Sequence, residues 1–267
     1  NVENLSPVDP PSKFDELAGI IVTNLRSPSI VVVEEIQDNT GPVNDGTVAA
    51  DQTFARLIAA ISSAGGPTYD WRAIDPVNNA DGGQPGGNIR VGFLFRTDNP
   101  DLQFVDRPGG GSTTAVGVVK IAGQTQLTSS PGRIDPTNTA FTNSRKPLAA
   151  EFLFRGKTVF VVANHWNSKS GDDPLFGRVQ PPVAGSETQR AGQAAAVADF
   201  VSDIFALQSN ANVVVAGDLN DFEYSAAVGI LTATGMLDLP STLPDGERYT
   251  YDFEGNSQVL DHILISP

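Results

Sequence analysis

The sequence predicts a mixed α/β fold in a single domain. Segments with helical periodicity alternate along the chain with short apolar runs rich in β-branched residues, a pattern typical of helices packed on sheets. The chain has 267 residues, of which 40% are hydrophobic, enough to bury a large core. No repeat or linker-like segment divides it. We therefore expect residues 1–267 to form one domain.

Three helices are predicted. The first covers residues 12–26, with Ser12 as its cap and a Ser-Pro pair after its end. The second covers residues 49–63. The third starts at Ser186, where the sequence Ser-Glu-Thr-Gln has the form of a capping box, and continues to about Ile204. Stretches rich in Gly, Asn and Pro predict long loops of the kind that select substrates; they are residues 76–88, 108–114, 129–143 and 170–186.

Acidic and amide side chains follow the apolar runs that we predict to be strands. Ligands of open α/β sheets bind at such strand ends, and buried carboxylates are costly unless they are paired or bind a metal. An Asx-rich turn, or simple alternation that turns one of the two glutamates to water, is the alternative interpretation. The residues concerned are Glu34 and Glu35 after 31–33, Asp218, Asn220 and Asp221 after 212–217, and Asp261 within 258–265.

The chain has only two histidines, His165 and His262. His165 follows the apolar run 158–163 and is flanked by Asn167 and Lys169, which suit an anionic oxygen, so it is the candidate catalytic imidazole. A lone histidine is otherwise more often structural. Because neighbours on a strand point to opposite faces, Asp261 facing the site would direct His262 away from it, and we expect His262 to be structural.

Taken in order, these segments resemble the endonuclease/exonuclease/phosphatase superfamily over essentially the whole chain. The resemblance implies a DNase I-like four-layer sandwich, in which two packed mixed β-sheets are flanked by helices. Three further segments are similar to the bacterial extracellular nuclease branch. The motifs are residues 1–5 (NVENL), 33–36 (VEEI), 164–169 (NHWNSK), 217–221 (GDLND) and 260–262 (LDH), and for the branch 144–148 (SRKPL), 173–178 (DPLFGR) and 249–256 (YTYDFEGN).

The resemblance assigns roles to individual residues. It implies catalytic roles for His165, Asp218, Asn220 and Asp261, phosphate binding by Arg145 and Asn167, and metal binding by Asn1 and Glu35. Asp218 would orient or deprotonate the attacking water, and Asn220 would hydrogen-bond the phosphate and help to position Asp218. Asp261 would orient the histidine of a terminal Ser-Asp-His motif, which in relatives lies beyond the position of Pro267. We therefore expect the chain to be a fragment cut at both ends.

The implied cofactor is a hard divalent cation, Mg²⁺ or alternatively Mn²⁺ or Ca²⁺. Oxygen ligands fit this choice, and the absence of cysteine argues against a structural zinc site.

The resemblance implies a metal-dependent phosphodiester hydrolase, specifically a secreted endonuclease whose substrate is DNA or RNA. A phosphatase or lipid phosphodiesterase of the same superfamily, or a non-catalytic module that retains the fold, are the alternatives, because the site residues do not separate them. We expect a monomer without a membrane span, since the apolar runs are of strand length.

The formal net charge of −14 is unevenly distributed along the chain. Residues 90–190 hold 12 of the 17 basic residues but only 8 acidic ones. This excess predicts a local basic surface that contacts successive phosphates of a nucleic acid, with ordinary solvated charge as the alternative. The candidates are Arg90, Arg96, Arg107, Arg133, Arg145, Lys146, Lys169 and Arg178.

Overall fold

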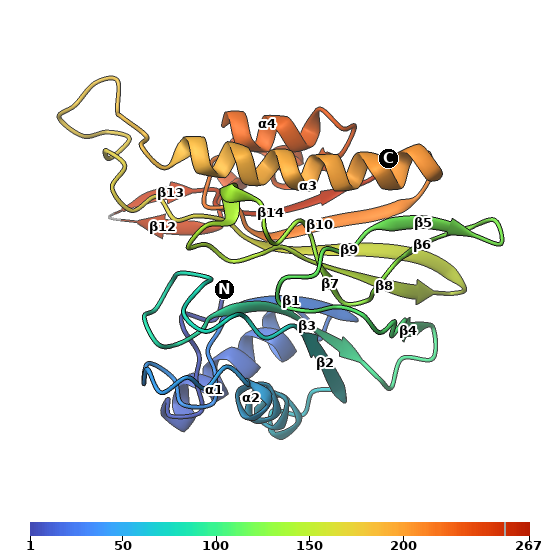
Figure 1. Cartoon of the computed structure of the whole chain (residues 1–267). Coiled ribbons are helices and arrows are strands. Elements are labelled where there is room, and N and C mark those ends of the chain that lie inside the picture. The colour runs from blue at the N-terminus through green and yellow to red at the C-terminus, as the bar shows by residue number, and fades with distance from the viewer. Residues whose placement is uncertain (254) are drawn as a thin grey trace.

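In the computed structural model, which describes residues 1–253 and 255–267, two β-sheets pack face to face and helices cover their outer faces (Figure 1). Helices α1 and α2 cover the smaller sheet, and α3 and α4 cover the larger one. This confirms the predicted α/β class and the four-layer arrangement.

The smaller sheet has the order β1-β3-β2 and is antiparallel throughout. Its helix α1 starts at a proline, with Pro10 as the capping residue, so the predicted cap at Ser12 is wrong. After Gly19 the helix widens into a π-helical turn over Ile20–Asn24. The second predicted helix is confirmed. The bounds are α1 Pro11–Gly19, β1 Ile30–Ile36, α2 Asp51–Ser63, β2 Tyr69–Ala73 and β3 Arg90–Arg96.

The larger sheet has the order β11-β14-β10-β9-β8-β4, with β7 paired to β8. Strands β9 and β10 are parallel, and helix α3 connects them as a crossover. Two separate hairpins, β5-β6 and β12-β13, extend from this half. The bounds are β4 Leu102–Phe104, β5 Val118–Ile121, β6 Gln124–Leu127, β7 Gly132–Arg133, β8 Leu148–Phe154, β9 Lys157–His165, α3 Glu187–Leu207, β10 Asn212–Asp218, α4 Ala226–Thr232, β11 Leu237–Asp238, β12 Tyr251–Phe253, β13 Asn256–Gln258 and β14 Asp261–Ile265.

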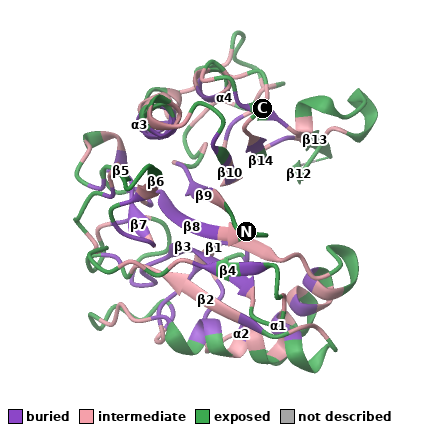
Figure 2. Ribbon diagram, turned by 90° about the vertical axis from the view of Figure 1, so that its right-hand side faces the viewer, coloured by how far each residue is buried: buried purple, intermediate pink, exposed green. Residues whose placement is uncertain are grey.

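Three apolar layers hold these elements together. One lies between α1, α2 and the small sheet, one between α3, α4 and the large sheet, and one between the two sheets, where Phe93 and Phe152 meet edge to face. Buried residues follow the central strands (Figure 2). Each fully buried side chain of this size contributes about 1.5–3 kcal/mol, so the sheets form a rigid frame for the strand ends.

The cap of α3 differs from the sequence prediction. Ser186 precedes α3, but its side chain makes no capping hydrogen bond to the helix backbone, so the predicted capping box is wrong. The motif at residues 249–256 forms the β12-β13 hairpin, while its Glu254 lies outside the described residues. None of the described helices is long and apolar enough to cross a membrane.

Candidate active site

Three neighbouring strands of the large sheet place their polar end residues side by side. Asp218 on β10 pairs with Asp261 on antiparallel β14 and with His165 on parallel β9. Residues paired across adjacent strands point to the same face of a sheet. The structure therefore brings Asp261, Asp218 and His165 into one row, which faces the smaller sheet.

The smaller sheet contributes two glutamates through a β-bulge in β1. The register with β3 shifts between Val33 and Ile36, and Glu35 has a φ of +63°, a conformation that costs a residue with a side chain some strain. Glu34 is buried, and Glu35 Oε1 lies 3.7 Å from His165 Nε2. The expectation that one glutamate faces water by alternation is wrong, because the bulge interrupts the alternation.

Gly217 allows the two sheets to approach each other at this point. Its φ is +134°, and a Cβ atom there would lie 2.0 Å from the Asn164 carbonyl oxygen and 2.9 Å from Glu34 Oε1. Only glycine accommodates both the conformation and the approach. The glycine before Asp218 is thus part of how the site is assembled.

Asp218 is held by hydrogen bonds from both sides. The Asn220 backbone N–H donates to Asp218 Oδ1 over 2.8 Å, and Asn1 Nδ2 donates to Oδ2 over 3.3 Å. Asn220 itself adopts a φ of +50°, and its side-chain amide donates to the Trp166 carbonyl. His165 Nε2 lies 3.8 Å from Asp218 Oδ2.

The carboxylates carry an excess of negative charge. Burial, together with the charge of Asp261, raises the pKa of Asp218 to about 6. Burial also raises the pKa of Glu34 to about 7, although the amino group of Asn1, 3.0 Å from Glu34 Oε2, acts in the opposite direction. Burial and the charge of Arg145 lower the pKa of His165 well below its usual value, so the imidazole is neutral at pH 7.

The two predicted phosphate-binding residues lie beside this row. Arg145 is buried, and its guanidinium donates to the Trp166 carbonyl; burial lowers its pKa. The Asn167 backbone N–H donates to Gln193 Oε1 over 2.8 Å, and its side chain is partly exposed. Their contacts with phosphate stay predictions.

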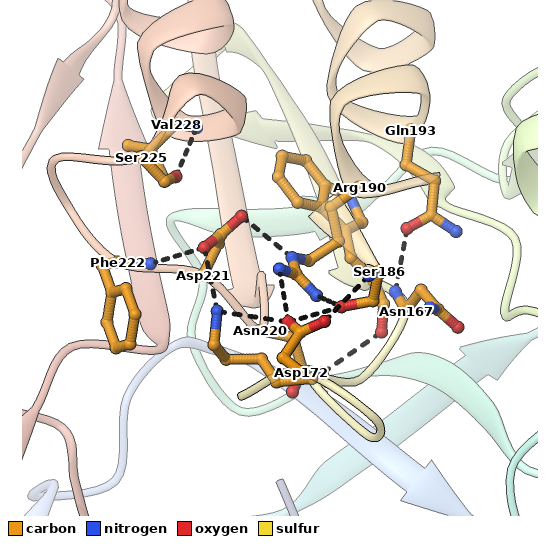
Figure 3. Close-up of polar contacts among 12 residues, drawn as sticks. Asn167, Asp172, Ser186, Arg190, Gln193, Asn220, Asp221, Phe222, Ser225 and Val228 are labelled. Carbon is orange, nitrogen blue, oxygen red and sulfur yellow. Dashed lines mark hydrogen bonds and ion pairs between the residues drawn. The ribbon is translucent and has the colours of Figure 1, made fainter. Parts of the chain in front are cut away.

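Asp221 does not join the row, although the sequence placed it with Asp218 and Asn220. Arg190, a fully buried residue of α3, donates from Nε to Asp221 Oδ2 over 2.9 Å (Figure 3). Its NH2 group also donates to Asp172 over 3.2 Å, and Ser186 Oγ donates to the same Asp172 oxygen. This ion-pair network ties α3 and the 170–186 loop to the segment after Asp218.

His262 has the structural role predicted for it. Its ring is buried, with Nδ1 3.0 Å from Asp238 Oδ1, and Nε2 donates to the Asp221 carbonyl over 3.0 Å. It therefore supports the segment after Asp218 from the far side of the sheet.

The donor groups fit a hard divalent cation. Glu35 exposes 18% of its side chain and lies 3.7 Å from His165 Nε2, which in turn lies 3.8 Å from Asp218 Oδ2. Asn1 Oδ1 accepts one hydrogen bond, from the Glu3 N–H, and retains a second lone pair. In the described part of the chain no three acidic or histidine side chains form a complete cage, but Mg²⁺ commonly takes only one or two carboxylates, with waters and substrate as the other ligands.

The predicted basic surface does not form. Six of the eight candidate side chains are ion-paired, among them Arg90 with Asp75, Arg133 and Lys146 with Asp81, and Arg107 with Glu151. Arg145 is buried. Of the eight, only Arg178 is exposed without an ion pair to a described residue. Carboxylates within the fold therefore neutralise most of the candidate side chains.

The comparisons with known proteins support the fold. No protein-family model matches this chain, and the comparison with curated proteins found no match. The human Nocturnin catalytic domain with bound sulfate superposes with a TM-score of 0.57 at 11% identity, covering 95% of this chain and 75% of that one. An endonuclease/exonuclease/phosphatase family protein from Leptotrichia buccalis superposes at 0.54 and 13% identity, covering 96% and 81%.

D. rerio TDP2 complexed with single strand DNA product gives a TM-score of 0.55 at 17% identity, covering 98% of this chain and 81% of that one. Identities this low establish shared architecture, not shared activity. The chain has the DNase I-like fold of endonuclease/exonuclease/phosphatase proteins, as the sequence predicted.

Proposed function

We propose that this protein is a divalent-metal-dependent phosphodiester hydrolase that acts on nucleic acid. The observation that supports this most is the row formed by Asp261, Asp218 and His165, with Glu35 of the opposing sheet 3.7 Å from the histidine. The row lies at strand ends, where sheets of this kind bind ligands. The fold shared with TDP2 complexed with single strand DNA product agrees with this substrate class.

Each of these side chains would have its own role in the in-line attack of water on the phosphate. Asp218, whose orientation is fixed by Asn220 and Asn1, would orient the water and accept its proton. His165 is neutral and buried, and its Nε2 faces the site, 3.7 Å from Glu35 Oε1 and 3.8 Å from Asp218 Oδ2, so a proton carried on Nε2 would be donated to a phosphate oxygen. Asp261 would orient the catalytic histidine of a terminal Ser-Asp-His motif, as the resemblance implies.

Glu35 and Asn1 would hold the cation, for which Mg²⁺ is our first choice. When bound, it would neutralise charge on the phosphate oxygens. The extracellular endonuclease assignment and secretion rest on the sequence motifs at residues 144–148 and 173–178. A phosphatase or lipid phosphodiesterase would use the same row, and no specific contact favours either.

The test is a panel of substrates offered to the purified chain. Plasmid DNA, RNA, sphingomyelin and a phosphomonoester are incubated with Mg²⁺, Mn²⁺, Ca²⁺ or EDTA. We expect metal-dependent cleavage of nucleic acid, lost in EDTA and in Asp218→Asn. Turnover confined to the lipid or the monoester would contradict the proposed substrate class.

A further inference from the structure

Two segments that adjoin the reactive row in the chain carry aromatic side chains, three of them exposed and Phe222 half-buried. The first pair, Phe222 and Tyr224, lies in the loop after Asn220 and Asp221; the second pair, Tyr251 and Phe253, lies on β12, which is followed by β13 and then by Asp261 at the start of β14. Tyr224 exposes 66% of its surface, Tyr251 47% and Phe253 49%. Rings of this size usually dominate core or interface contacts, so their clustering at a reactive site indicates a binding surface.

The first pair is held with its rings parallel. The Phe222 and Tyr224 centroids are 5.3 Å apart with an interplanar angle of 18°, and Lys169 Nζ lies 4.3 Å from the Phe222 centroid. Lys169 in turn pairs with Asp221 over 3.4 Å. Phe222 is thereby fixed between a cation and a ring, while Tyr224 is directed to solvent.

The second pair sits on a hairpin that is bonded to the reactive row. Tyr251 and Phe253 have centroids 6.3 Å apart and an interplanar angle of 15°. Thr250 Oγ1 accepts hydrogen bonds from the backbone N–H groups of Leu260 and Asp261, each over 3.0 Å. Figure 1 shows the β12-β13 hairpin projecting from the left side of the larger sheet. The two rings are thus connected to Asp261 by a short, hydrogen-bonded path.

We infer that these two aromatic pairs bind unpaired bases of a single-stranded nucleic acid by stacking, next to the reactive carboxylates. The inference deepens the proposed function and rests on it for the reaction, but not for binding. Each base that stacks on an aromatic ring contributes about 1–3 kcal/mol without sequence preference. In a duplex the base faces are already stacked on each other, so the rings select single strands.

The charge distribution explains why stacking is needed. A nucleic-acid surface ordinarily draws its affinity from Lys and Arg, but here most candidates are paired with carboxylates or buried. A protein with a net charge of −14 gains little from long-range attraction to phosphates. Flat rings provide affinity that does not depend on charge, so binding should vary only weakly with salt.

A lipid surface fits these rings less well. Asp252 alternates with Tyr251 and Phe253 and pairs with Ser257 across the hairpin, and Glu223 separates Phe222 from Tyr224. Asp252 points to the face of the hairpin opposite the two rings, so insertion of the hairpin into a bilayer would have to desolvate it, whereas a base that stacks on one ring face leaves it in water.

The test is equilibrium binding of a fluorescent oligothymidylate, measured by anisotropy in the Asp218→Asn background so that the probe is not cleaved. We expect Tyr224→Ala and the double change Tyr251→Ala with Phe253→Ala each to raise Kd about tenfold. Tyr224→Phe keeps the ring and should stay within about twofold. The matched control is Phe154→Ala, an exposed phenylalanine at the opposite end of β8 and β9.

Two further binding measurements, with a duplex and with varied salt, distinguish base stacking from attraction to phosphates. A duplex of equal length should bind at least about tenfold more weakly, and the plot of log Kd against log salt should have a slope below about 2. Equal affinity for the duplex, or unchanged Kd in the ring variants, would overturn the inference. Capture by phosphatidylcholine–sphingomyelin vesicles that requires the rings would also overturn it. Ring-dependent binding without hydrolysis of any phosphodiester would support the inference while contradicting the proposed function.

Discussion

Replacing Arg190 by leucine should destabilise the protein more than any surface charge change. The guanidinium is 0% exposed and bonds Asp172 and Asp221, whose side chains are each 4% exposed. Its removal leaves two buried carboxylates without their main partner, and breaking a buried pair typically costs about 3–5 kcal/mol. Lys169, within 3.8 Å of both acids and 25% exposed, compensates in part, so we expect about 3 kcal/mol.

Urea unfolding at pH 7 measures this loss as a lower midpoint with an unchanged slope. The matched control is Arg155→Leu, whose partner is Asp101 and whose side chain is 70% exposed, and which should cost at most about 1 kcal/mol. Adding Asp172→Asn to Arg190→Leu should restore part of the loss, because it removes one of the uncompensated charges. An Arg190→Leu chain within about 1 kcal/mol of the parent would refute the reasoning.

Three further predictions concern the frame and the cation. Gly217→Ala should lower the free energy of unfolding by at least about 2 kcal/mol in chemical denaturation, because the added Cβ would meet the Asn164 carbonyl. Gly229→Ala in α4, where a Cβ has nothing within 4 Å, should be neutral or stabilising. Equal effects of the two changes would contradict this. Burial lowers the pKa of His262, but Asp238 raises it more, so the pKa lies above its usual value. The loss of stability in His262→Gln should therefore be largest below pH 6.5 and shrink as the pH rises. A loss of stability that grows with pH would contradict this. Glu35→Gln should raise the Mg²⁺ concentration for half-maximal activity at least about tenfold, while the exposed Glu16→Gln should not; equal requirements would exclude Glu35 as a ligand.

The sequence predicted the features that depend on local patterns. Alternating periodicities indicate the α/β class, and apolar runs ending in acids locate Asp218 and His165 at strand ends. The register that places Asp261, Asp218 and His165 side by side follows from strand order, which the resemblance implied and local periodicity does not specify.

Other features depend on contacts between distant segments. The bulge that turns Glu35 inward requires the pairing of β1 with β3. Asp172 and Arg190 lie 18 residues apart, and no local pattern predicts that they meet. The hydroxyl of Ser186 donates to the same Asp172 and does not cap α3, which the local sequence could not indicate. The basic segment was misinterpreted for the same reason, since composition does not reveal which carboxylates neutralise it.

The central claim is that the strand-end row performs phosphodiester hydrolysis, and the most direct test is the turnover of Asp218→Asn. The substrate is a single-stranded oligonucleotide at saturating Mg²⁺, with the exposed Asp203→Asn on α3 as the matched control and circular dichroism to verify the fold. We predict a loss of at least about a hundredfold in kcat for Asp218→Asn, as expected for removal of a proton acceptor, and little change for the control. A correctly folded Asp218→Asn chain that retains kcat within about threefold of the parent would contradict the account.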